Sequence, residues 1–448
     1  MSYIALSDKD KKEMLAKVGV SDLDGLFQSI PEPIRLREPL AVPGPLAETE
    51  LLSYFEKTGS RNAYNAHLSF LGAGAYDHFI PSVVDSLSSR GEFVTPYTPY
   101  QPEVSQGTLQ IVFEFQTLIC QLTGLDIANA SLYDGATAAA EAVLMAHRLK
   151  SKAKVLVGCS IHPQYRHVIR TYIQNLGVEA VEFAYGPDGR ADLGDIEKKL
   201  DGATAAVVFQ TPNFFGVIED VKALSELARR RQALSVAIVA EAASLGILEA
   251  PGKLGADIVT GEAQSFGMPL SYGGPYLGFM ACAKDFVRQL PGRIAGQTVD
   301  VDGKRGFVLT LSTREQHIRR ESATSNICTN QALCAVRATM FLETLGEKGL
   351  REWALQNVHK ARYAQGELGR IKGVKLKFGG PVFNEFVLEL GKDWAAVDMT
   401  LRAKGILGGY GLAREYPEFK NAVLVCVTEM RGKDEIDRLV KAVEEALR

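Results

Sequence analysis

The sequence predicts an α/β protein built on a mostly parallel, doubly wound sheet, followed by a smaller C-terminal α+β domain. Continuous apolar, β-branched runs alternate with amphipathic helical patterns, which is typical of strands buried on both faces and joined by helices. The sequence after Thr329 changes to two long helical patterns and then to strands and helices in a different order. The predicted central strands are 154–158, 178–184, 205–210, 235–240, 256–261 and 275–281.

The chain divides into three predicted regions. Residues 1–103 combine short helices at 8–18 and 47–57 with a stretch rich in Pro and Gly at 31–48, as expected of an arm that wraps over another surface. Residues 104–329 form the large domain, which begins with a helix that runs to Gly124. Residues 330–448 form the small domain, with strands at 375–378, 383–390 and 422–429 and helices from Trp394 and Asp434.

Composition narrows the function classes. The 448 residues carry a formal net charge of −3, so no broad basic surface for nucleic acid or an anionic membrane is expected. No signal segment and no apolar run of membrane-spanning length is visible. The six cysteines have neither disulfide nor zinc-ligand spacing, which favours a reducing cytoplasm and no metal site.

One motif could hold a phosphate. Asp134, Gly135, Ala136 and Thr137 open a strongly helical run, and free amides at a helix N-terminus bind anions. Asp134 is also a good N-cap residue, whose carboxylate would occupy the same donors. The sequence leaves both interpretations open.

Three other motifs lie at predicted loops. His162, before Pro163, could stack on a bound ring or simply start a helix. The segment 210–213 could face a ligand at a strand end or form a plain turn. Gly72-Ala73-Gly74 lacks the third glycine and the preceding strand of a dinucleotide loop, so a nicotinamide site is not expected.

Together these motifs resemble pyridoxal-phosphate (PLP) enzymes of the aspartate-aminotransferase-like fold, called fold type I. Four longer strings resemble more specifically the N-terminal half of the glycine dehydrogenase (decarboxylating) family, the P-proteins of the glycine cleavage system. These strings are FLGAGAYDHFIP (70–81), TPYTPYQPEVSQGTLQ (95–110), LYDGATAAAEA (132–142) and TREQHIRRESATSNICTNQAL (313–333). The resemblance covers essentially the whole chain.

The resemblance implies that two homologous halves exist, either fused or as separate subunits in an α2β2 heterotetramer. The other half carries the lysine that binds PLP covalently. Gln264 stands at that position here, and Glu241 stands where an aspartate for the ring nitrogen is expected. Neither Lys253 nor Lys284 has a placement from which it could substitute. We therefore expect a vestigial cofactor pocket at Asp134–Thr137, His162, Glu241 and Gln264.

The resemblance further implies the reaction. The holoenzyme would decarboxylate glycine on PLP held by the partner, subunit 2, release CO2, and pass the aminomethyl group to the lipoyl arm of H-protein. This chain would complete the partner's site, with Tyr76, His78, Tyr97, Tyr100 and Gln101 as candidate contacts. The alternatives are an independent PLP enzyme of aminotransferase or desulfurase type, and a non-catalytic scaffold or regulatory homologue.

Overall fold

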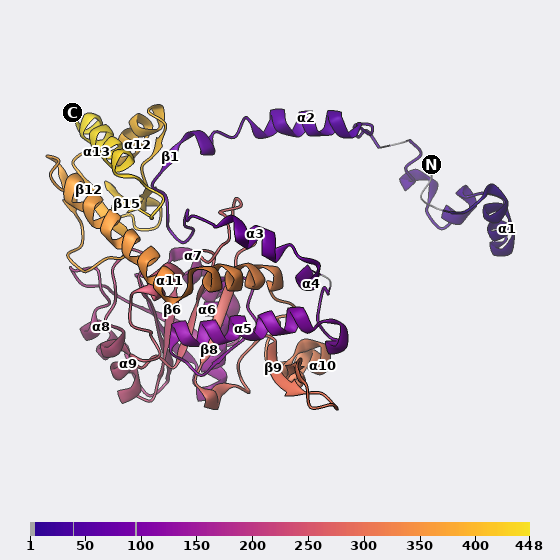
Figure 1. Cartoon of the computed structure of the whole chain (residues 1–448), viewed down its shortest axis with the longest axis horizontal. Helices are drawn as coiled ribbons and strands as arrows, with labels where there is room; N and C mark the ends of the chain where they lie inside the picture. The colour runs from indigo at the N-terminus through magenta and orange to yellow at the C-terminus, as the bar shows by residue number, and fades with distance from the viewer. Residues whose placement is uncertain (1–4, 39, 95) are drawn as a thin grey trace. The chain divides into compact units, whose positions relative to one another are not determined.

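The computed structural model describes residues 5–38, 40–94 and 96–448. The chain divides into two compact units, Met1–Tyr64 and Asn65–Arg448 (Figure 1). The predicted boundaries near residues 103 and 329 both fall inside the second unit. We keep these two boundaries as a proposed subdivision of the second unit.

The first unit consists of two helices and irregular chain. Helix α1 spans Asp8–Val18 and begins at a capping box made by Ser7 and Asp10, while α2 spans Glu48–Gly59. Both helices agree with the predicted ranges. None of the described residues in 5–64 is buried, so this unit has no apolar core of its own.

The second unit is organised around a seven-stranded sheet with strand order β2-β8-β7-β6-β5-β3-β4. Strands β3 to β7 run parallel, whereas β8 is antiparallel to β7, and β2 is antiparallel to β8. The strands are β2 (Ile127–Ala128), β3 (Lys154–Gly158), β4 (Glu179–Phe183), β5 (Thr204–Gln210), β6 (Leu234–Val239), β7 (Ile258–Glu262) and β8 (Gly278–Cys282).

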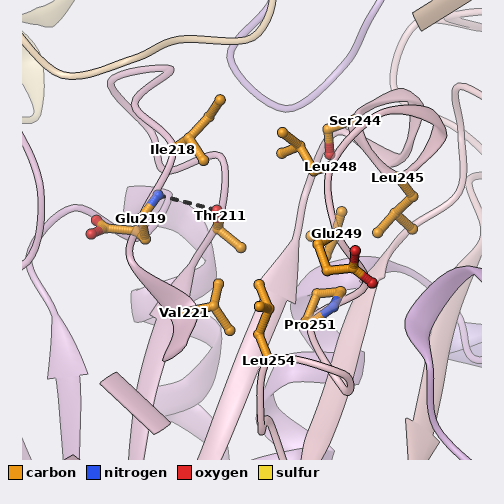
Figure 2. A pocket seen from close by; sticks show the side chains of 11 residues that line it. Thr211, Ile218, Glu219, Val221, Ser244, Leu245, Leu248, Glu249, Pro251 and Leu254 are labelled. Carbon is orange, nitrogen blue, oxygen red and sulfur yellow. Dashed lines mark hydrogen bonds between the residues drawn. The ribbon is translucent and has the colours of Figure 1, made fainter. Parts of the chain in front are cut away.

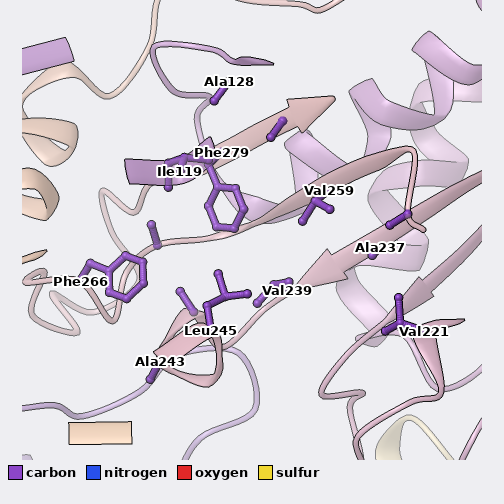
Figure 3. Packing of buried hydrophobic residues seen from close by; sticks show 14 of the residues in the cluster. Ile119, Ala128, Val221, Ala237, Val239, Ala243, Leu245, Val259, Phe266 and Phe279 are labelled. Atoms are coloured by element: carbon purple, nitrogen blue, oxygen red, sulfur yellow. The ribbon is translucent and has the colours of Figure 1, made fainter. Parts of the chain in front are cut away.

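Alternate residues of each strand point to opposite faces of this sheet, and both sets are apolar. Helices therefore cover both faces. Ala237, Val239 and Val259 face one core, which also contains Ile119 of α5 and Val221 of α9 (Figure 3). The intervening residues of the same strands face a second core beneath α6 and α7. The helices of this region are α5 (Gln106–Thr123), α6 (Gly135–Lys150), α7 (Pro163–Ile173), α8 (Leu193–Lys199) and α9 (Val221–Arg230).

Shorter elements flank the sheet. Strand β1 (Leu68–Ser69) pairs in parallel with β13 (Ile406–Leu407), which ties the start of the second unit to its C-terminal part. Strands β9 (Ile294–Val299) and β10 (Arg305–Thr310) form an antiparallel hairpin. The remaining short helices are α3 (Ser82–Ser88), α4 (Gly91–Val94) and α10 (Gln316–Arg319).

The C-terminal part has its own four-stranded antiparallel sheet, in the order β11-β12-β15-β14. Helix α11 (Ala332–Leu368) is interrupted at Gly346, whose backbone is not helical, so it corresponds to the two predicted helical patterns. The other elements are β11 (Val374–Leu376), β12 (Glu385–Leu390), α12 (Trp394–Ala403), β14 (Tyr410–Gly411), β15 (Ala422–Cys426) and α13 (Lys433–Leu447). The predicted fold class, a mostly parallel sheet followed by a smaller α+β part, is confirmed.

Candidate functional site

The N-terminus of α6 is occupied by two carboxylates of the chain itself. Asp134 caps the helix, accepting a hydrogen bond of 2.7 Å from the amide of Thr137. Glu262, at the end of β7, accepts from the amide of Gly135 at 2.9 Å and from the amide of Leu277 at 2.7 Å. A phosphate at this helix end would have to compete with both side chains for these same amides.

Gln264 is fully engaged with main-chain atoms. Its Oε1 accepts from the amide of Tyr76 at 3.0 Å, and its Nε2 donates to the carbonyls of Tyr76 at 3.0 Å and Met268 at 2.8 Å. The side chain is buried. The residue at the expected lysine position therefore anchors another segment of the chain.

His162 also contacts this segment. Its Nδ1 accepts from the amide of Gln164 at 3.2 Å, which leaves Nε2–H to donate to the carbonyl of Ala73 at 2.8 Å. Burial lowers the pKa of His162, in keeping with a neutral ring. A Cβ at Gly74 would lie 2.8 Å from Nε2, so main chain packs where a bound ring could stack.

His78 joins the buried carboxylate of Glu241 to the half-buried carboxylate of Glu429. Its Nδ1 lies 2.7 Å from Glu429 Oε2, and its Nε2 lies 3.5 Å from Glu241 Oε2. Burial by itself would lower the pKa of His78, but the Glu241 and Glu429 carboxylates outweigh it and raise the pKa to about 10. Burial opposes ionisation of Glu429 too, yet the bond from His78 brings the pKa of Glu429 to about 2. The imidazole is therefore charged at neutral pH.

Glu385, at the start of β12, holds the same segment from another side. Its Oε1 accepts from the amide of Ala73 at 2.6 Å, and its Oε2 accepts from the hydroxyl of Tyr76 at 2.9 Å. Burial raises the pKa of Glu385 to about 7, against the opposing effect of these two donors. The carboxyl group thus changes its ionisation near neutral pH.

These contacts converge on Gly72–Phe79, here called the pocket loop. The loop contacts His162, Glu241 and Gln264, the three side chains expected around a PLP ring, while Glu262 takes an amide expected to bind its phosphate. The loop fills the space between those groups. Among the described residues, those gathered here do not fit PLP, because Gln264 offers no amine to bind it, the Gly135 and Thr137 amides are already taken, and the loop packs against His162.

Neither of the two nearby lysines reaches this pocket. Lys253 precedes β7 and forms an exposed ion pair with Glu249 at 3.4 Å. Lys284 follows β8, which runs antiparallel to β7, so both lysines lie at the amino edge of β7. Gln264 follows the opposite end of that strand.

The candidate contact residues separate into two groups. Tyr76 and His78 are buried, and their side chains are bonded within this chain. Tyr97 and Tyr100 are 89% and 53% exposed, and Gln101 is exposed as well. Only the second group is available to another protein.

The segment 210–213 forms an internal turn. Gln210 Oε1 accepts from the amide of His162 at 2.8 Å, and Asn213 Nδ2 donates to Glu219 Oε1 at 2.7 Å. Thr211 and Glu219 line a small, mainly apolar pocket of about 100 Å³ together with residues of 244–254 (Figure 2). The Glu219 carboxylate points away from the other lining residues, so this pocket offers little for catalysis (Figure 2).

The family model for the glycine cleavage system P-protein matches residues 1–443. This chain belongs to the P-protein family. A probable glycine dehydrogenase (decarboxylating) subunit 1 from Moorella thermoacetica is 52% identical over 99% of both chains. A crystal structure of glycine decarboxylase (P-protein) in inhibitor-bound form superposes with a TM-score of 0.91 at 44% identity, covering all of both chains. The match therefore covers nearly the full length of this chain and of the Moorella relative.

A more distant neighbour bears on the fold alone. The sphingosine-1-phosphate lyase of Burkholderia pseudomallei superposes with a TM-score of 0.68 at 16% identity over 92% of both chains.

No helix within the described ranges is long and apolar enough to cross a membrane. Among the same residues no cluster of His, Cys, Asp and Glu could hold a metal ion.

Sequence reasoning missed Glu262, Glu385 and Glu429. Glu262 lies two residues before Gln264, and an acidic residue ending a buried strand was a usable signal. Glu385 and Glu429 lie more than 300 residues from the pocket loop that they hold. No spacing rule connects residues so far apart.

Proposed function

We propose that this chain is the subunit of glycine decarboxylase that carries no cofactor and completes the active site of a PLP-bearing partner. The observation that supports this most strongly is the pocket loop, which satisfies Gln264, His162 and Glu241 from within the chain. An independent aminotransferase or desulfurase would need a lysine in this pocket. Gln264 cannot serve, because an amide nitrogen does not form a Schiff base.

The holoenzyme we propose is an α2β2 heterotetramer of this chain and a second P-protein subunit, working in the cytoplasm. It takes glycine, releases CO2 and transfers the aminomethyl group to the lipoyl arm of H-protein. PLP, held by the partner, would supply the electron sink for the negative charge that develops on decarboxylation. The chain described here orients the scissile bond and excludes water.

The exposed residues Tyr97, Tyr100 and Gln101 are the proposed contacts to the partner's site. They lie in irregular chain just before α5, and Tyr97 is 89% exposed. Tyr76 and His78 contribute indirectly, because they hold the pocket loop in place. Aromatic side chains of this exposure are typical anchors at protein interfaces.

Carboxyl exchange between glycine and bicarbonate tests the division of labour. We expect neither this chain nor a lysine-bearing partner to catalyse efficient exchange alone, whereas their mixture with H-protein does. Full activity of the partner alone would reduce this chain to a scaffold. Full activity of this chain alone would restore the independent-enzyme alternative.

Single alanine variants then test the contacts. Replacing Tyr97, Tyr100 or Gln101 by Ala should lower the exchange rate of the mixture without releasing PLP or dissociating the complex. Met399→Ala on α12, a similarly exposed side chain, is the control and should leave the rate unchanged. Rates equal to the control for all three variants would remove these residues from the site.

A further inference from the structure

Arg293 is a buried cation that forms no ion pair with any carboxylate of the described residues. It immediately precedes β9 and is only 7% exposed. Its Nη2 donates to the carbonyl of Cys328 at 2.8 Å, and its Nη1 donates to Asn330 Oδ1 at 3.0 Å and Thr329 Oγ1 at 3.4 Å. All three acceptors are neutral. Within residues 5–38, 40–94 and 96–448, no carboxylate lies within ion-pair distance of Arg293.

Part of the guanidinium is also without an acceptor. Its Nε is buried and has no hydrogen-bond partner among the described residues. A guanidinium has five N–H donors, and the three bonds above leave Nε–H and one Nη2–H. This is the pair of donors that one carboxylate or phosphate group can accept together.

Arg314 shows that the chain does neutralise a comparable side chain nearby. It is equally buried, at 7% exposed, and donates to the carbonyls of Leu290 and Gly292. It also has a carboxylate partner, Glu315, at 3.7 Å. The Glu315 carboxylate also acts on Arg293, but from beyond ion-pair distance. Because a buried charge without a close counter-ion is costly, the difference suggests that the close anion for Arg293 comes from outside this chain.

The ring of Tyr100 lies between Arg293 and the protein surface. Its Cζ is 5.7 Å from the centre of the Tyr100 ring, which in turn is 5.2 Å from the ring of His317. Tyr100 is half exposed and His317 is exposed. Tyr100 thus covers a cationic position on the surface that also carries the proposed contacts to the partner.

We propose that Arg293 is an oxyanion receptor that this chain contributes to the shared active site, with Tyr100 as its cover. The ligand is a carboxylate or phosphate group bound by the partner, which glycine or the cofactor would present. This inference rests on the proposed function and assigns a specific chemical task to one residue of it. No step of the reaction changes, because Arg293 binds and orients a group without exchanging a proton.

The test uses the assembled enzyme with its partner and H-protein. Arg293→Gln should raise either the KM for glycine or the Kd for PLP at least tenfold, while kcat changes less than threefold. A shift in KM identifies a carboxylate, and a shift in Kd identifies a phosphate. Inorganic phosphate should compete with the affected ligand in the unmodified enzyme and compete more weakly in the variant.

Two further variants separate binding from folding. Arg314→Lys is the control, because it perturbs a buried arginine that already has a carboxylate partner, and it should leave KM and Kd within twofold. Asn330→Asp places a carboxylate beside Arg293 and should weaken the same ligand, although it also removes the Nδ2 donor to the Ala130 carbonyl and the Ser131 hydroxyl, so its thermal stability is measured alongside. This second variant keeps the test valid if Arg293→Gln does not fold.

The outcomes are distinct from those of the exchange experiment. If the unmodified mixture does not exchange carboxyl groups, the proposed function fails. If the mixture is active but Arg293→Gln and Asn330→Asp leave both KM and Kd unchanged, only the oxyanion receptor fails. A fall in kcat and thermal stability alone would make Arg293 a structural residue.

Discussion

The carboxamide of Gln264 and the main chain of Tyr76 form a closed pair of hydrogen bonds, each 3.0 Å long. The carboxamide supplies one acceptor and one donor, and the main chain of Tyr76 requires both. A lysine at this position could donate but not accept. The residue at the expected lysine position is therefore also one that holds the pocket loop.

Gln264→Lys should destabilise the chain by about 1–3 kcal/mol, because the buried amide of Tyr76 loses its acceptor. It should not create activity without the partner or yield a borohydride-reducible pyridoxyl-lysine, because the pocket loop still fills the site. Chemical denaturation measures the loss of stability, and mass spectrometry of the borohydride-reduced protein detects any pyridoxyl-lysine. Gln116→Lys is the matched control, since Gln116 pairs with the main chain of Ala295 through bonds of 2.8 and 2.9 Å. A stoichiometric pyridoxyl-lysine in Gln264→Lys would contradict the filled pocket.

Asp134→Ala should lower stability by about 1 kcal/mol through loss of the α6 cap and leave the glycine KM of the assembled enzyme unchanged. Asp220→Ala is the control, since Asp220 caps α9 with a bond of 3.0 Å to the amide of Ala223. The two variants should lose similar amounts in thermal denaturation. An unchanged melting temperature together with a large rise in KM would instead assign Asp134 to a ligand.

Stability should fall at alkaline pH because of His78. Its folded-state pKa of about 10 lies above the ordinary 6.5, so its contribution is complete below pH 6.5 and is lost as pH rises toward 10. The contribution of His78 to the free energy of unfolding is a few kcal/mol. His78→Gln should be less stable at pH 6 and should show a flatter decline between pH 7 and 10. Parallel stability curves for the two proteins would exclude a charged His78.

Glu385 should make the stability of the folded protein decline over a second, lower pH range. Because its folded-state pKa of about 7 lies above the ordinary 4.5, the folded state binds this proton more tightly, and stability falls as pH rises from 4.5 to 7. Glu385→Gln can still accept from Ala73 and donate to the Tyr76 oxygen, and it should remove about 3 kcal/mol of this decline. Glu389→Gln, an exposed position on β12, should retain it. Urea denaturation at several pH values is the measurement.

The fold could be predicted largely because its signals are local. Apolar runs such as 205–210 are fully buried strands, and Gly124 ends α5 in the left-handed conformation that favours glycine. The cap at Asp134 was foreseen as one of two interpretations, and the hydrogen bond to Thr137 forms as that interpretation expects. These features depend on neighbours within a few residues.

The filled pocket could not be predicted, because its contacts join distant segments. Gln264 meets Tyr76 across 188 positions, and Glu385 meets Ala73 across 312. The string at 70–81 was recognised as a family signature and Gly72–Gly74 was excluded as a nucleotide loop, but neither observation indicates where the loop packs. The exposure of Tyr97 and the burial of Tyr76 likewise depend on tertiary structure.

The approach of Gly74 to His162 has an evolutionary consequence. Gly74 has a positive φ of 97°, and any Cβ there would collide with the imidazole. A larger residue at position 74 should therefore be tolerated only where position 162 carries a smaller side chain. We expect these two positions to covary among subunits of this type, and Gly74→Ala to be rescued in part by a second substitution at His162.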